Sequence, residues 1–256
     1  MKPFILMTAG AIFLIVFLVL RDKKSSVPAI IFKTATSLCF VATALAALSG
    51  RNDEPTRELV LTAGLIVLGL VMGLVGDIFL DLKPYFKGYS AVCADSAKNH
   101  DNVTYFGMTA FGLGHILYAA ALLIRFPDAL GALLRLLLIS IAVTAAIMCV
   151  SVFVMKMRFG RFIIPAVFYS ILLALFTVLT AFILFSEKEG GAAAMLFTGS
   201  LLFLISDLIL SITYFSKSED YEREGVMNPE SRFMIVLNHV TYYAAQFMIA
   251  LSIARL

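Results

Sequence analysis

The residues with the clearest chemical potential occur in two matching patterns. In each pattern an aspartate is followed, on the next apolar segment, by Leu-x-His-x-x-Tyr-x-Ala-Ala. The members are Asp77, His115 and Tyr118 in the first half of the chain and Asp207, His239 and Tyr242 in the second half. The chain has only three histidines, and two of them fall in this match. Carboxylates and imidazoles in an apolar chain can transfer protons, ligate a metal or couple transport to protons.

The surroundings of these residues are far more apolar than a soluble protein allows. Of 256 residues, 61% are hydrophobic and 14% are charged, and the mean hydropathy is +0.96. Soluble domains carry about 25% charged residues. This composition excludes a cytosolic enzyme, a nucleic-acid-binding protein and a disordered tail, and it predicts a polytopic membrane protein.

The apolar residues form eight stretches, each about as long as a membrane-spanning helix. Alternation with a period of two is absent, so the pattern predicts an all-α fold of eight transmembrane helices rather than a barrel. No loop is long enough to fold alone, so the chain is one integral-membrane domain, 1–256. The predicted helices are 4–20, 28–49, 59–82, 105–126, 130–155, 162–186, 191–215 and 232–255.

The matching patterns and the basic residues predict an internal repeat and an orientation. The patterns lie four helices apart, so they predict a 4+4 parallel repeat about an axis along the membrane normal. The loops after helices 1, 3, 5 and 7 carry 12 basic residues, and the opposite side carries 6. The positive-inside rule therefore places these loops in the cytoplasm and both termini outside it.

The ionisable residues within the spans gather in the half nearest the cytoplasm. Asp77 lies about one turn inside the end of its helix, Asp81 lies at that end, and Lys33 lies about five residues into the second helix. Because buried charges are costly in a bilayer, we expect them to line one polar pocket that opens toward this leaflet. Three alternatives are simpler. Lys33 extends to the headgroups, Asp81 is a solvated helix end, or Asp77 and Asp207 only pair with Lys33 or the histidines and so hold the bundle together.

At these residues the sequence resembles the YhhN-like family of membrane proteins, whose characterised members are lysoplasmalogenases. The similarity extends over essentially the whole chain and includes Lys33 in the second helix. Thr34 stands where the family often has proline, and the loop 83–104 is longer than usual. The matching segments are Gly69 to Leu80 with Gly73, Gly76 and Asp77; Phe106, Gly107, Phe111, Gly114, His115 and Tyr118; Phe203 to Leu208 with Asp207; and Thr241 to Gln246.

The resemblance implies hydrolysis of the vinyl-ether bond of a lysophospholipid within the bilayer. Such a bond needs a proton donor and an anion that stabilises an oxocarbenium ion, as in glycosidases, and two carboxylates meet that need. The hypothesis is that Asp77 and Asp207 form the pair and that His115 and His239 relay protons. The substrate-binding residues would be Lys33 at the phosphate, Tyr118, Tyr242 and Gln246 at water or the glycerol hydroxyl, and Asp81.

Two alternatives stay open. Two histidines and two aspartates also suit a metal-dependent membrane lipid hydrolase, although no HExxH-type spacing occurs and we expect no metal and no cofactor. Parallel repeats with buried acids also suit a proton-coupled small-molecule or lipid transporter, although the paired broken helices typical of transporters are absent from the sequence. The expected location is a bacterial cytoplasmic membrane or the endoplasmic reticulum.

Overall fold

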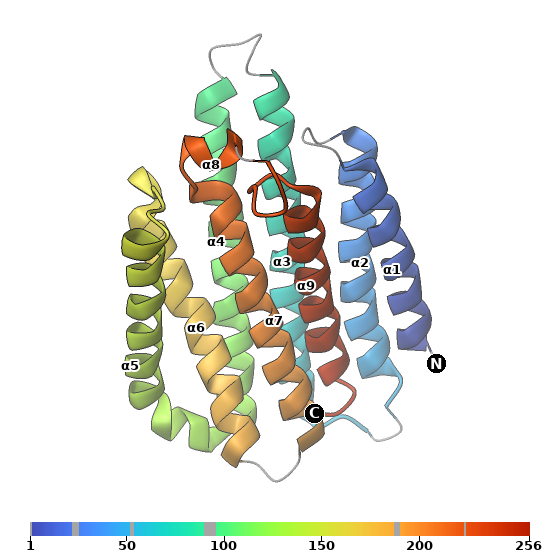
Figure 1. Ribbon diagram of the computed structural model, residues 1–256. Coiled ribbons are helices and arrows are strands. Elements are labelled where there is room, and N and C mark those ends of the chain that lie inside the picture. The colour runs from blue at the N-terminus through green and yellow to red at the C-terminus, as the bar shows by residue number, and fades with distance from the viewer. Residues whose placement is uncertain (1, 22–25, 52–53, 90–95, 187–189, 223) are drawn as a thin grey trace. The chain divides into compact units, whose positions relative to one another are not determined.

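The computed structural model is built from helices (Figure 1). It describes residues 2–21, 26–51, 54–89, 96–186, 190–222 and 224–256; for 83–89, 96–100 and 218 it describes the backbone alone. No strand occurs in this described part of the chain. The helices are α1 (Lys2–Leu20), α2 (Val27–Ser49), α3 (Arg57–Tyr89), α4 (Ser96–Arg125), α5 (Pro127–Cys149), α6 (Ile163–Ser186), α7 (Gly190–Phe215), α8 (Ser218–Glu222) and α9 (Arg232–Ser252).

Eight of these helices are long and apolar enough to cross a membrane, and each coincides with one predicted span. The prediction of an all-α, multi-pass membrane protein is therefore confirmed. A π-helix, Val150–Val154, continues α5, and a 3-10 helix, Gly160–Phe162, leads into α6. The short helix α8 lies between the last two spans and was not predicted, because it is polar and only five residues long.

The prediction of a loop from 83 to 104 is wrong for most of its length. Helix α3 continues to Tyr89, and α4 already begins at Ser96. Hydropathy marks the point where side chains stop being apolar, whereas the backbone hydrogen bonds of a helix can continue into water. The ends of the apolar runs were therefore mistaken for the ends of the helices.

The chain divides into two compact units. Unit 1 comprises residues 1–121 and 253–256, and unit 2 comprises residues 122–252. The division falls close to the boundary between the two predicted repeats. Gly69 and Gly199 each stand eight residues before the matched aspartate, and both lie where a neighbouring helix approaches closely. These observations support the 4+4 repeat, which stays a prediction.

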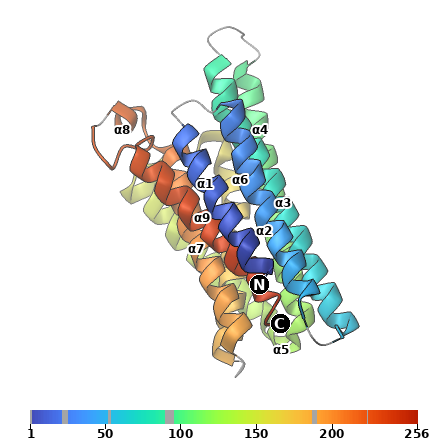
Figure 2. The ribbon, with the colours of Figure 1, turned by 90° about the vertical axis from the view of Figure 1, so that its right-hand side faces the viewer.

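In unit 1, α2 packs against α1 and α3, and α3 packs against α4 through glycines (Figures 1 and 2). A Cβ atom on Gly69 would overlap Cε1 of Tyr118, and one on Gly76 would lie 2.6 Å from the ring of Phe111. Small residues allow such close approach where lipid supplies no hydrophobic driving force between helices. The glycines of α3 therefore hold Tyr118 and its helix against α3.

Replacing Gly69 by alanine is expected to destabilise the protein by about 1–3 kcal/mol, because the new methyl group overlaps the buried Tyr118 ring. The thermal unfolding midpoint in detergent measures the effect. Gly64→Ala is the matched control, since a Cβ atom there meets nothing within 4 Å and alanine favours a helix. Equal midpoints for the two variants would contradict the proposed role of Gly69.

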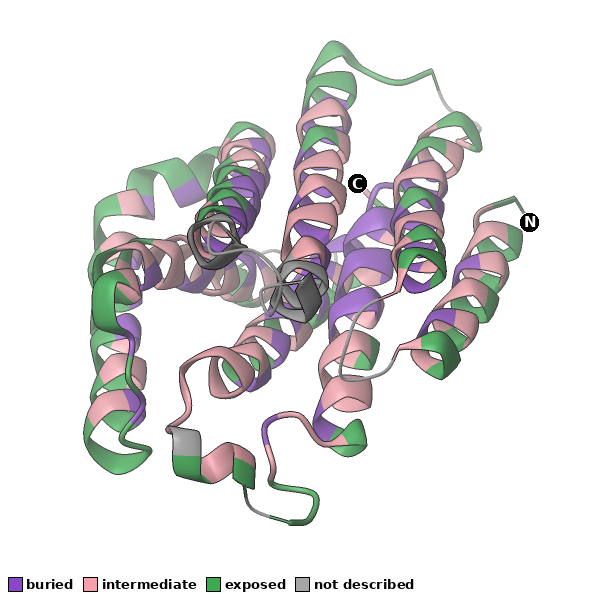
Figure 3. Ribbon diagram, turned by 90° about the horizontal axis from the view of Figure 1, so that it is seen from above, coloured by how far each residue is buried: buried purple, intermediate pink, exposed green. Residues whose placement is uncertain are grey.

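In unit 2, α7 packs against α9, and α6 packs against α5 and α7. A Cβ atom on Gly199 would lie 2.9 Å from Cγ1 of Ile249, so α7 and α9 also approach closely at a glycine. The Thr180 and Ser200 hydroxyls are 2.8 Å apart and join α6 to α7. In Figure 3, single helices carry both buried and exposed residues, so one side of such a helix is packed and the other side is exposed.

Candidate active site

Lys33 lies in the buried stripe of α2. The Ser26 side chain caps the start of this helix by accepting a hydrogen bond from the Ala29 amide at 3.3 Å, and Pro28 occupies its first turn. The stripe continues at helical spacing through Ala29, Lys33, Ser37 and Phe40. The lysine is 6% exposed, so its side chain is packed against neighbouring helices.

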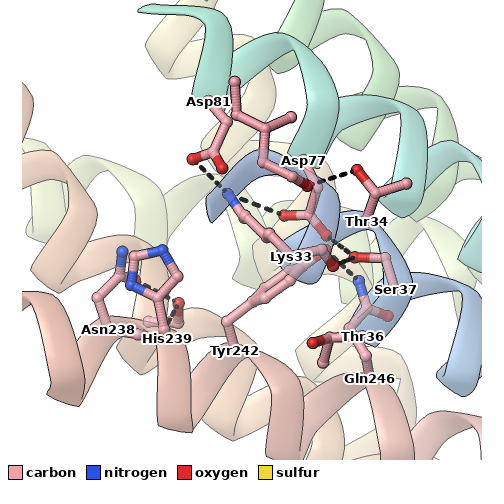
Figure 4. Close-up of polar contacts among 12 residues, drawn as sticks. Lys33, Thr34, Thr36, Ser37, Asp77, Asp81, Asn238, His239, Tyr242 and Gln246 are labelled. Atoms are coloured by element: carbon pink, nitrogen blue, oxygen red, sulfur yellow. Dashed lines mark hydrogen bonds and ion pairs between the residues drawn. The ribbon is translucent and has the colours of Figure 1, made fainter. Parts of the chain in front are cut away.

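The Lys33 ammonium lies between two carboxylates of α3. Asp77 and Asp81 are one turn apart and therefore on the same side of that helix. The Lys33 Nζ atom is 3.5 Å from Oδ1 of Asp77 and 3.1 Å from Oδ1 of Asp81 (Figure 4). All three side chains are buried. We name these three residues the lysine–aspartate cluster.

Ser37 completes this arrangement on the side of Asp77. Its hydroxyl donates to Oδ2 of Asp77 at 2.7 Å and lies one turn beyond Lys33 on α2 (Figure 4). Sequence reasoning missed Ser37, although its spacing of four residues from Lys33 placed it on the same face. Asp77 is thus held by a hydroxyl and an ammonium from one helix, which fixes the direction in which its carboxylate points.

Asp81 is 4% exposed and contacts the same ammonium, so the alternative of a solvated helix end is wrong. Its two oxygens are not equivalent. Oδ1 accepts from Lys33, whereas Oδ2 is buried and has no hydrogen-bond partner among the residues that the structure describes. Asp77 and Asp81 therefore share one lysine but differ in the hydrogen bonds that their carboxylate oxygens accept.

His115 and Tyr118 also belong to unit 1. Both side chains are buried on α4, and their rings meet edge to face with centroids 6.1 Å apart. The spacing of three residues had predicted a shared helical face, and the ring contact confirms it. The ring of Tyr118 packs over Gly69, which lies on α3, the helix that also carries Asp77 and Asp81.

Asp207 lies in unit 2, where its partner is a residue that sequence reasoning missed. The Tyr169 hydroxyl of α6 donates to Oδ2 of Asp207 on α7. The available signal was a phenol inside a span otherwise rich in Ile, Leu and Phe. The preceding residue, Ser206, donates to Oδ1 of Asn238 at 2.7 Å and so joins α7 to α9.

The other predicted residues of unit 2 lie along α9. His239 is half-buried, and its Nδ1 is 2.7 Å from the Ile235 carbonyl oxygen. Because a carbonyl only accepts, Nδ1 donates this hydrogen bond and therefore carries a proton. Two turns along, the buried Gln246 amide donates to the Tyr242 hydroxyl at 3.0 Å.

The comparisons with known proteins identify the family of the chain. The family model of the YhhN family matches residues 28–253. The chain belongs to the YhhN family. No curated protein and no solved structure matches the chain.

The YhhN match contains every site residue predicted from the sequence. The structure joins Lys33, Asp77 and Asp81 directly, and it places His115 and Tyr118 in the same unit. Asp207, His239, Tyr242 and Gln246 belong to the other unit. The predicted Asp77–Asp207 pair and the single pocket combine residues of both units and stay predictions. Among the described residues, no group of three His, Cys, Asp or Glu side chains is arranged to hold a metal.

Proposed function

We propose that this YhhN protein hydrolyses the vinyl-ether bond of lysoplasmalogens and releases a fatty aldehyde and a glycerophospho-alcohol. The observation that carries the proposal is the lysine–aspartate cluster, buried in a membrane protein of this family. A buried carboxylate pair that shares one ammonium is costly in an apolar chain, and such groups within membranes usually serve a function.

The chemistry of the bond explains why carboxylic acids are needed. A proton adds to the β-carbon of the vinyl ether and leaves an oxocarbenium ion at the α-carbon. Water adds to the α-carbon, and the resulting hemiacetal breaks into an aldehyde and the free glycerol hydroxyl. A carboxylic acid can supply the first proton, and a nearby carboxylate can stabilise the cation. The substrate has no acyl carbonyl, so neither a serine nucleophile nor an oxyanion hole is required.

Asp77 is the proposed proton-transfer group of unit 1. Ser37 and Lys33 orient its carboxylate. The predicted contact of Lys33 with the lipid phosphate is a separate prediction. Asp207, oriented by Tyr169, is a separate proposal for the second acid. His115 and His239 relay protons, and Tyr118, Tyr242 and Gln246 orient water or the glycerol hydroxyl.

The test is incubation of the detergent-solubilised protein with three lysolipids that have the same headgroup and differ only in the bond at the sn-1 position. The vinyl-ether lipid is expected to release aldehyde, whereas the acyl and alkyl-ether lipids are expected to release neither fatty acid nor alcohol. In D₂O the aldehyde gains one deuterium at the former β-carbon, which reports carbon protonation. Release of fatty acid from the acyl lipid would contradict the proposal.

The purified protein, in detergent and reconstituted into proteoliposomes, also tests the two alternatives from the sequence. A proton-coupled carrier would move lysolipid into proteoliposomes without forming aldehyde. A metal-dependent hydrolase would lose its activity in chelator and regain it with added metal. The proposed acid/base reaction requires aldehyde formation that persists in chelator.

A further inference from the structure

The unsatisfied oxygen of Asp81 is the feature that the proposed reaction does not use. Oδ2 of Asp81 is buried and has no hydrogen-bond partner in the described part of the chain, while Oδ1 of the same carboxylate is 3.1 Å from Nζ of Lys33. Leaving a buried charged acceptor without a donor is costly, because the atom has lost its hydrogen bonds to water and gained none in return. Such an atom in a folded protein calls for a ligand that supplies the missing donor.

The charges of the cluster point to a positive ligand. Lys33, Asp77 and Asp81 carry one formal positive and two formal negative charges. Asp77 has the Ser37 hydroxyl as an additional donor, so the deficit falls on Asp81. In an apolar surrounding, where opposite charges attract strongly, a cation with a hydrogen to donate satisfies both the charge and the open oxygen.

The depth of Asp81 matches the position of a lipid headgroup. In the sequence, the apolar stretch of α3 ends at Leu82 and is followed by Lys83, so Asp81 lies at the edge of that stretch. Asp77 lies one turn, or about 6 Å, deeper. In a lysoplasmalogen the amine is the outermost group, followed by the phosphate, the glycerol and then the vinyl ether. Asp81 therefore lies nearer the headgroup layer, as the amine does, and Asp77 lies nearer the hydrocarbon, as the vinyl ether does.

We propose that Asp81 binds the primary ammonium group of an ethanolamine headgroup. This inference rests on the proposed function for the identity of the lipid, and it names the part of the lipid that the cluster recognises. A primary ammonium has N–H groups that can donate to Oδ2. A choline headgroup has the charge but no N–H group, and a phosphoglycerol headgroup has neither. The expected order of affinity is ethanolamine, then choline, then glycerol.

The kinetic test compares lysoplasmenyl lipids that have these three headgroups and the same chain. For the wild-type protein, KM is expected to be at least about tenfold lower for ethanolamine than for glycerol, as one charge-assisted hydrogen bond allows. In Asp81→Asn the difference in KM is expected to disappear. A variant that kept the ethanolamine preference would overturn the proposal. So would an equal loss of kcat for all three headgroups, because Asp81 would then act in the chemical step.

A binding test separates this inference from the proposed reaction. The non-cleavable alkyl-ether lysolipids with the same three headgroups are titrated by calorimetry, with no turnover needed. If the wild-type protein released no aldehyde, the proposed function would fail, and the binding order would still decide the role of Asp81. Equal dissociation constants for the ethanolamine and glycerol lipids on the wild-type protein would overturn the inference without any variant.

Two further variants control for charge and fold. Asp128→Asn removes the same carboxylate from an exposed position on α5, and it is expected to leave the headgroup preference as in the wild type. Asp81→Glu keeps the charge and is expected to retain a preference for ethanolamine over glycerol. Loss of the preference in Asp128→Asn would show that general surface charge causes it, and loss in Asp81→Glu would show that packing at this position causes it. Either result would overturn the proposal.

Discussion

Replacing Asp77 by asparagine is expected to lower kcat for aldehyde release by about 10²–10⁴-fold, the usual contribution of a positioned acid or base. Asparagine has nearly the same shape and keeps an acceptor for the Ser37 hydroxyl, which lies 2.7 Å from Asp77. It cannot transfer the proton that the vinyl ether requires. The measurement is aldehyde formation by the purified variant at saturating lysoplasmenyl lipid, with the unfolding midpoint recorded alongside.

The control for Asp77→Asn is Asp128→Asn, which makes the same exchange at an exposed position and is expected to retain full activity. Asp207→Asn is measured in parallel and tests the separate proposal for unit 2, where Tyr169 donates to this carboxylate. If either folded variant released aldehyde at nearly the wild-type rate, the acid/base role of that aspartate would have to be abandoned.

Replacing Lys33 by methionine is expected to destabilise the protein by about 3–5 kcal/mol, because removing one partner of a buried ion pair leaves the other charge uncompensated. Here two carboxylates, 3.5 and 3.1 Å from the ammonium, lose their counter-ion together. Methionine fills a similar volume, so the effect reports charge rather than a cavity. The unfolding midpoint in detergent is the measurement.

The double variant Lys33→Met, Asp81→Asn provides the control, since it removes one of the two uncompensated charges. It is expected to be more stable than Lys33→Met alone, with a coupling of about 0.5–3 kcal/mol, as found for residues in contact. Lys2→Met, at an exposed position, is expected to change little. Additive effects of Lys33→Met and Asp81→Asn would contradict the ion pair between them.

The spans were predictable because a helix in lipid must have apolar side chains and must satisfy its own backbone hydrogen bonds. A long apolar stretch in the sequence is enough to indicate such a helix. The side of each helix that faces its neighbours was not predictable, because a side that faces lipid is as apolar as a side that packs against another helix. Helix α1 shows this: Phe4 and Ile5 are 65% and 66% exposed, whereas Phe17 is fully buried. Only polar residues and glycines indicate the packed side of such a helix.

The same reasoning explains which site residues were found. Asp77, Asp81 and Lys33 stand out because charge is rare in an apolar chain, and the ion-pairing of Asp77 with Lys33 was among the alternatives. Ser37 and Tyr169 donate to the two predicted acids and were missed. A serine or tyrosine is common in membrane helices, and its importance depends on which neighbouring helix faces it. The packing of the helices decides which helix that is, and the local sequence does not show it.

The length of α3 has a consequence for how the lipid reaches the protein. Its 33 residues extend about 50 Å, whereas the hydrocarbon layer is about 30 Å thick, so roughly 20 Å of this helix must emerge from the bilayer. The emerging end is the one next to Asp81, since the apolar stretch of this helix ends at Leu82 and is followed by Lys83. Under the proposed function, the leaflet on the side of this end supplies the lysolipid. The orientation of the protein in the membrane then decides which of the two leaflets that is.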